Sequence, residues 1–328
     1  LGSRIAEVHN GSALFTGDAG QGESNIRRWI IENDWLEAIV ALPDVMFYNT
    51  SISTYVWVLT NRKPTPRKGK IQLVNGTGLF KRMRKGLGEK RKELGQDDIA
   101  IIAKTYGGFL ASDIAKVFDN ADFGYRRITL ERPLRLNFQT APSRIERLRS
   151  EAAFENLAKS KKKGATGEHE VEQGRELQEQ IVAALLSLNP SLVIKNRDAF
   201  EKAIRSAFQE AKIDVPTSVF KSVMSALSER DETTDVCLDN KGRPEPDVSL
   251  RDNENVPLKE EIKTYFNREV VPHVPDAWID ETKTKIGYEI PFTRHFYEYK
   301  PLRPLADIER EIHALEAEIQ GLLGKALQ

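Results

Sequence analysis

The stretch LEAIVALPDVMFYNTSISTYVWVL, residues 36–59, carries the clearest fold signal in this chain. Residues 36–42 are a compact apolar run that stops at Pro43, and residues 52–60 are rich in β-branched and aromatic side chains. Both patterns are typical of strands, and the first is typical of a buried strand. Further strands are predicted over 4–8, 70–74, 116–118 and 125–130, and helices over 24–33, 97–106 and 143–158. Strands that alternate with helices indicate an α/β sheet.

The loop after the first of these strands brings two aromatic rings and an amide to one edge of the predicted sheet. It contains Phe47, Tyr48, Asn49 and Thr50, shortly after Pro43. In open α/β sheets, ligands bind in the crevice outside the carboxyl ends of the strands, so either ring can meet a flat ligand there. From these residues alone, the alternative is that both rings plug the sheet against a helix.

The charge of the chain is balanced overall but segregated along the sequence. The 49 Lys and Arg equal the 49 Asp and Glu, which excludes a uniformly basic nucleic-acid coat. Residues 62–92 nevertheless hold twelve Lys or Arg and one acid, whereas acids outnumber bases eleven to five over residues 229–261. Within the basic segment, Lys81, Arg82, Arg84 and Lys85 are candidates for DNA phosphate contact. A solvated charged loop explains the same segment equally well.

Composition restricts the class of protein. At 328 residues with 40% apolar and 30% charged side chains, one or two folded domains are expected rather than a disordered chain. The single cysteine, Cys237, can form neither an internal disulfide nor a Cys-rich zinc site, which favours a reducing cytoplasm. The apolar runs are far shorter than the ~20 residues of a membrane span. We therefore expect a cytoplasmic protein without a membrane segment.

The second half of the chain has mainly helical patterns. Residues 159–174 contain a lysine run and little that is apolar, which indicates a linker. Helices are predicted over 176–188, 197–212 and 216–230, and a last one begins near Pro304. In the last helix, apolar residues repeat at the a and d positions of a heptad: Leu305, Ile308, Ile312, Leu315, Ile319 and Leu322. Such a seam is buried only against another helix, either of a partner or of its own domain.

Motifs for cofactor, metal or nucleophilic chemistry are weak. The loop 17–22 has the order GxxGxG rather than GxGxxG, so a surface loop is favoured over a phosphate site. Asp276, Glu281 and Lys283 superficially match a metal-dependent nuclease, but four residues between the carboxylates are few for adjacent strands. The five histidines show no paired metal spacing. We expect no metal site and no covalent catalysis.

Several blocks of sequence resemble one known family when they are taken together. They are residues 11–15 and 26–29, the run 36–43, Phe47 to Thr50, residues 55–59, 118–120, 123–126 and 131–134, and then 269–278, 285–292 and 295–299. In this order they resemble the modification subunit of type I restriction-modification enzymes, which are DNA adenine-N6 methyltransferases. The poorest match lies over residues 150–230.

The resemblance implies a specific set of roles. Phe47 would form a wall of the adenine pocket, shaped further by Tyr48, Asn49 and Thr50. The terminal helix would dock on the specificity subunit through Leu305, Ile308, Ile312, Leu315, Ile319 and Leu322. The implied partners are DNA, a specificity subunit, a second modification subunit and a restriction subunit. S-adenosylmethionine would be the methyl donor of the complete subunit.

The departures from the family matter as well. The Gly-rich motif that binds S-adenosylmethionine and the Asn-Pro-Pro-aromatic motif that positions the target amine do not occur in this sequence. The resemblance therefore implies only the C-terminal part of such a subunit, with its methyl-transfer residues unknown, no cofactor bound and no activity alone. The alternative function is a DNA-binding or assembly module that never performs methyl transfer.

The expected architecture follows from these observations. Residues 1–140 would be the later strands and helices of a Rossmann-like methyltransferase sheet, and residues 141–175 a helix and linker. Residues 176–303 would be a helical C-terminal domain, and residues 304–328 a coiled-coil-like helix.

Overall fold

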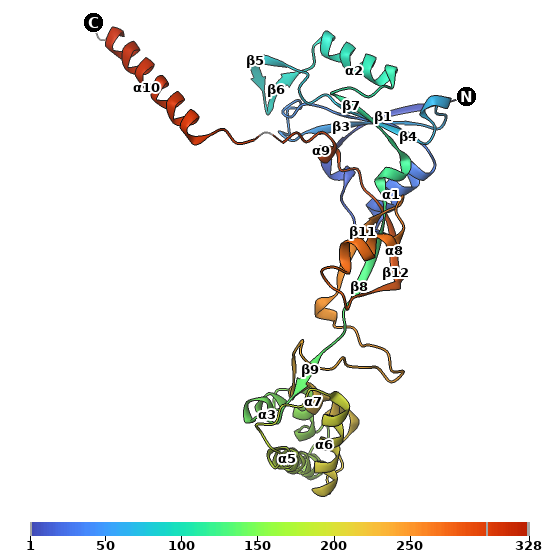
Figure 1. Ribbon diagram of the computed structural model, residues 1–328, viewed down its shortest axis with the longest axis vertical. Coiled ribbons are helices and arrows are strands. Elements are labelled where there is room, and N and C mark those ends of the chain that lie inside the picture. The colour runs from blue at the N-terminus through green and yellow to red at the C-terminus, as the bar shows by residue number, and fades with distance from the viewer. Residues whose placement is uncertain (1, 300, 327–328) are drawn as a thin grey trace. The chain divides into compact units, whose positions relative to one another are not determined.

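The computed structural model describes residues 2–299 and 301–326, which fall into two compact units (Figure 1). Unit 1 joins the segment up to Gly124 to the segment from Gly287 onward, and unit 2 is Tyr125–Ile286. The predicted domain boundaries near 140, 175 and 303 lie elsewhere along the chain and stay a prediction. None of the described helices is long and apolar enough to cross a lipid bilayer.

Unit 1 is built on a five-stranded mixed sheet. Its elements are β1 (Arg4–Asn10), α1 (Gly22–Glu32), β2 (Leu36–Ala41), β3 (Thr54–Thr60), β4 (Lys70–Asn75), β5 (Lys81–Leu87), β6 (Lys90–Glu93), α2 (Gln96–Gly108), β7 (Ala115–Asp119), α9 (Phe292–His295) and α10 (Leu305–Ala326). The strand order is β1-β3-β2-β4-β7. The β2–β4 pairing is parallel, whereas β1–β3, β2–β3 and β4–β7 are antiparallel. The predicted mixed α/β class is thereby confirmed.

The centre of the sheet contains the apolar run 36–42. All six residues of β2 are buried, because β3 and β4 flank the strand and helices cover the sheet. Val40 and Val74 pack with Ile102 of α2 in one core cluster. Figure 1 shows α1 and α2 on opposite sides of this sheet. The end of β2 is therefore a rigid position from which a loop can start.

Unit 2 contains a helical core and a small sheet. Its elements are β8 (Gly124–Glu131), β9 (Leu136–Phe138), α3 (Pro142–Leu148), α4 (Ala152–Glu155), α5 (Ala165–Leu186), α6 (Arg197–Glu210), α7 (Thr217–Ala226), β10 (Ser228–Arg230), β11 (Asp252–Pro257), α8 (Ile262–Tyr265) and β12 (Trp278–Tyr288). The helical core includes Phe138, Phe154 and Phe200. The order β11-β8-β12 forms the three-stranded sheet, whose Ile128 and Val256 pack in a second cluster.

The predicted linker over 159–174 is wrong from Ala165 onward, where α5 begins. Two glycines of this segment allow close backbone contact. A Cβ on Gly174 would lie 1.8 Å from the carbonyl oxygen of Leu157, and a Cβ on Gly167 would lie 2.2 Å from that of Lys162. These residues are glycine because the helix packs tightly on the chain before it.

Candidate functional site

The loop after β2, residues 43–53, is the first part of the site and is called the aromatic loop. The Leu42 amide donates to the Thr54 carbonyl at 2.8 Å at its base, and Phe47 forms an isolated bridge with Thr50 near its tip. Between them, Val45 has φ +49°. A β-branched residue in this left-handed region carries strain of about 1–3 kcal/mol, so the surroundings must hold the loop in this shape.

A second element provides that support. Strands β5 and β6 pair as an antiparallel hairpin, Lys81–Glu93, which is called the basic hairpin. The Arg91 and Lys92 amides both donate to the Val45 carbonyl, at 2.8 and 3.3 Å, and the Glu89 amide donates to the Tyr48 carbonyl at 2.9 Å. The structure therefore brings together the aromatic cluster and the basic segment that the sequence singled out separately.

Side chains strengthen the same junction. The Lys92 ammonium pairs with the Asp44 carboxylate and lies 4.1 Å from the centroid of the Phe80 ring. Gly88 at the turn of the hairpin has φ +61°, and a Cβ there would lie 2.5 Å from the Tyr48 carbonyl oxygen. Glycine is required at this position both for the backbone conformation and for the close approach.

The exposure of the predicted residues differs along the loop. Tyr48 is 63% exposed and Asn49 is exposed, whereas Phe47 and Thr50 are half-buried. Tyr48 therefore does not plug the sheet. On the hairpin, Lys81, Arg82, Arg84 and Lys85 are all exposed, as phosphate contacts must be. Contact of these eight residues with a nucleic acid stays a prediction.

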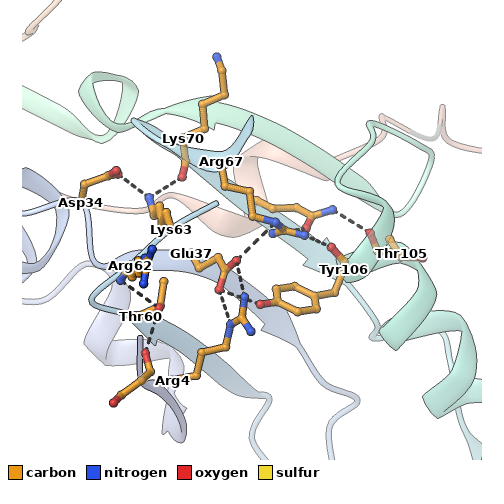
Figure 2. Close-up of polar contacts among 12 residues, drawn as sticks. Arg4, Asp34, Glu37, Thr60, Arg62, Lys63, Arg67, Lys70, Thr105 and Tyr106 are labelled. Carbon is orange, nitrogen blue, oxygen red and sulfur yellow. Dashed lines mark hydrogen bonds and ion pairs between the residues drawn. The ribbon is translucent and has the colours of Figure 1, made fainter. Parts of the chain in front are cut away.

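Beneath the sheet surface lies a buried polar cluster that sequence reasoning missed (Figure 2). Glu37 of β2 is fully buried and accepts hydrogen bonds from the Arg4 guanidinium at 2.9 Å and the Tyr106 hydroxyl at 2.8 Å. The Arg67 guanidinium lies 3.4 Å from the same carboxylate and 4.3 Å from the Phe109 ring centroid. Burial alone raises the pKa of Glu37, but the hydrogen bonds from Arg4 and Tyr106 hold that pKa below its ordinary value.

A neighbouring ion pair ties strand ends together. The buried Lys63 ammonium lies 2.6 Å from the Asp34 carboxylate and donates to the Lys70 carbonyl at 2.7 Å. Asp34 also accepts from the Asn120 side chain at 2.9 Å. Burial lowers the pKa of Lys63. Because every charge in these contacts has a partner, we assign the Glu37 and Asp34 clusters to the stability of unit 1 rather than to chemistry.

The terminal helix α10 exposes its apolar seam. Leu305, Ile308, Ile312, Leu315, Ile319 and Leu322 are between 38% and 70% exposed. These side chains are thus not packed on the rest of their own unit. A coiled coil with a partner helix stays a prediction.

The nuclease-like residues are engaged elsewhere. Asp276 lies 3.4 Å from the Arg132 guanidinium, and Lys283 lies 2.8 Å from Glu131 and from Asp280. Over residues 2–299 and 301–326, no group of three or more His, Cys, Asp or Glu side chains could hold a metal ion.

Comparison with known proteins bears directly on the segment that carries the site. The N-6 DNA methylase family model matches residues 2–125. The MjaVII type I methylase subunit of Methanocaldococcus jannaschii is 34% identical over 103 residues, which are 31% of this chain and 17% of the relative. The MjaIX type I methylase subunit of the same organism is 42% identical over 65 residues, 20% of this chain and 12% of the relative.

A solved structure matches over a similar share of the chain. The methyltransferase subunit of a type I restriction-modification system from Streptococcus thermophilus has a TM-score of 0.32 and 21% identity, and the match covers 37% of this chain and 24% of that one. The chain thus spans less than a quarter of each of these three proteins. Residues 2–125, which include the aromatic loop and the basic hairpin, match the N-6 DNA methylase family model, and parts of this chain are similar in sequence to the methylase subunits of type I restriction enzymes.

Proposed function

We propose that this chain is part of the modification subunit of a type I restriction-modification enzyme, which transfers a methyl group from S-adenosylmethionine to adenine N6 in DNA. The observation that carries the proposal is the pairing of the aromatic loop with the basic hairpin inside the segment that matches the family. The β1-β3-β2-β4-β7 sheet would then be the later part of a Rossmann-like methyltransferase sheet. The setting would be the cytoplasm.

The glycine-rich motif that binds the methyl donor in the family does not occur in this sequence. The glycine-rich loop that it contains, 17–22, precedes α1, and a Cβ on Gly17 would lie 2.7 Å from the Glu23 carboxylate. That carboxylate places a negative charge at the start of α1, which disfavours binding of a phosphate-like anion by this loop. Binding of the donor, and the methyl transfer itself, would belong to the rest of the complete subunit. The chain alone would be inactive.

The role of the aromatic loop follows from the cost of reaching a base. An enzyme that modifies a duplex base rotates it out of the stack at a cost of a few kcal/mol. Stacking of the base on an aromatic ring stabilises it by ~1–3 kcal/mol, which is comparable to the cost of rotating it out of the duplex. Phe47 would form the wall of the adenine pocket, with Tyr48, Asn49 and Thr50 shaping it. The half-buried position of Phe47 supports this role, since the ring is held by the protein and still reachable.

Phe47→Ala in the complete subunit is expected to lower methylation of an oligonucleotide duplex about 5- to 150-fold, because the stacking energy is removed. The measurement is the rate of tritiated methyl transfer at saturating donor. Phe15→Ala removes an exposed ring of unit 1 outside the loop and should leave the rate unchanged. An unchanged rate for Phe47→Ala, with unaltered thermal unfolding, would remove Phe47 from the pocket.

Neutralising the basic hairpin is expected to lower the affinity for DNA and to make that affinity depend less on salt concentration. Replacing Lys81, Arg82, Arg84 and Lys85 with glutamine should reduce the slope of log K against log [salt] by about 1 for each phosphate that is no longer neutralised. Fluorescence anisotropy with a labelled duplex measures the slope. The control replaces Lys159, Lys161, Lys162 and Lys163, which changes net charge equally. Equal slopes for both variants would show that the hairpin is only a solvated charged surface.

The apolar seam of α10 would dock on the specificity subunit. A second modification subunit and a restriction subunit would complete the assembly. The exposure of all six seam residues supports a partner outside this chain.

A further inference from the structure

The aromatic loop depends on the basic hairpin for its shape. Within the loop, the Val45 amide donates to the Ser51 carbonyl at 3.4 Å, a long hydrogen bond for a residue with a strained backbone. The Val45 carbonyl, in contrast, accepts from two amides of β6, at 2.8 and 3.3 Å. The contacts that determine the loop therefore come largely from the hairpin.

The hairpin reaches the loop at two points on either side of Phe47. Arg91 and Lys92 hold Val45, and Glu89 holds the Tyr48 carbonyl. The Asp44–Lys92 ion pair closes the same contact from the start of the loop. The opposite strand, β5, carries the exposed cations. The hairpin thus contacts both ends of the segment 45–48.

We propose that the basic hairpin is a positioning element: DNA phosphates bound on β5 fix the aromatic loop through the Val45 and Tyr48 carbonyls, and so set the ring of Phe47. This inference rests on the proposed function, which assigns DNA to the hairpin and a base to the loop. It adds a coupling between them. The hairpin holds the pocket wall without DNA, and a bound DNA backbone would hold it more firmly, which ties base capture to correct docking.

Gly88 is the position at which the coupling can be broken without removing a charge. A methyl group there would lie 2.5 Å from the Tyr48 carbonyl oxygen, so Gly88→Ala must separate the hairpin from the loop. Gly69→Ala is the matched control, because Gly69 has φ +71° and open space around its Cβ position. Both variants carry the same kind of backbone cost. Asp44→Asn is a second variant, which breaks the ion pair to Lys92 and leaves the cations of the hairpin untouched.

The first experiment uses the chain without DNA. Hydrogen exchange of peptides covering residues 43–53 should be about tenfold faster in Gly88→Ala and faster in Asp44→Asn, and unchanged in Gly69→Ala. Asp44→Glu should restore slow exchange. Unchanged exchange of the loop in both Gly88→Ala and Asp44→Asn would overturn the positioning role, whatever the DNA affinity.

The second experiment adds a saturating duplex. In the unaltered chain, DNA should slow exchange in the hairpin and in the aromatic loop together. In Gly88→Ala, protection of the hairpin and the DNA affinity should stay within about twofold, since no phosphate contact is removed, while the loop is no longer protected. Equal protection of the loop in both proteins would overturn the coupling. If the unaltered chain binds no DNA, the proposed phosphate contact is wrong, and the coupling of DNA to the loop is overturned with it. The first experiment decides separately whether the hairpin shapes the loop.

Discussion

Replacing Glu37 with glutamine is expected to lower the free energy of unfolding of unit 1 by about 3–5 kcal/mol. The side chain keeps its size, so the effect isolates the charge. Arg67 is only 8% exposed and would lose its anionic partner in a site from which water is excluded. A buried guanidinium that loses its anionic partner keeps its charge, because arginine is not deprotonated in proteins.

The variant can be measured by urea unfolding followed by tryptophan fluorescence. Trp57 is buried in β3 of unit 1, beside β2, and reports on this unit. Glu7→Gln is the matched control, because Glu7 is an exposed carboxylate on β1. If Glu37→Gln lowers the free energy of unfolding by less than about 1 kcal/mol, the Glu37–Arg67 ion pair contributes no more than a weak surface ion pair.

The contribution of Glu37 to the free energy of unfolding depends on pH with a definite sign. The pKa of Glu37 is lowered in the folded chain by its hydrogen bonds from Arg4 and Tyr106, against the effect of burial. Its contribution to stability is therefore present above the unfolded pKa of about 4.3 and is lost as the pH falls through the folded value. The difference in stability between the unaltered chain and Glu37→Gln should shrink below about pH 4, whereas it should be constant between pH 6 and 8.

The central strands of the five-stranded sheet were predictable because their apolar residues indicate burial directly, whereas β5 and β6 in the basic segment were not predicted. The run 36–42 and the aromatic segment 52–60 form β2 and β3 close to the expected bounds. Glu37 inside that run is itself a signal, since a carboxylate in a fully buried strand requires a buried partner. Its partners, Arg4, Arg67 and Tyr106, come from three separate segments, and no local pattern identifies them.

The site was predictable as two parts and not as one. The composition of the loop and of the basic segment indicated a ligand surface for each. Their contact is made by main-chain groups of Val45 and Tyr48, which leave no trace in residue type. Gly88 is the one residue whose type is affected by this contact. A glycine at a hairpin turn is ordinary, however, so the sequence does not reveal its close approach to Tyr48, which is a tertiary property. The first half of α5 was missed for the same reason: the helix predicted over 176–188 begins at Ala165, and the close packing at Gly167 and Gly174 is a tertiary property that the local composition does not reveal.

Aspartate at Ile312 and Ile319 is expected to abolish docking of α10 on the specificity subunit. Both residues lie one heptad apart on the exposed seam, so they would face the same partner helix. Burying each isoleucine is worth about 1.5–3 kcal/mol, so the double variant should lose about 3–6 kcal/mol of binding before any charge is buried. That loss corresponds to roughly 10²- to 10⁴-fold in Kd.

The measurement is the binding of the complete modification subunit to immobilised specificity subunit. Ala314→Asp with Ala317→Asp is the matched control, because it adds the same charge to the same helix at positions outside the seam. Circular dichroism shows whether both variants keep the helix. Binding within about threefold of the unaltered subunit in the seam variant would refute the docking role. An equal loss of affinity in both double variants would mean that net charge, rather than apolar burial along the seam, governs the association. The two variants differ only in whether the substituted positions lie on the seam.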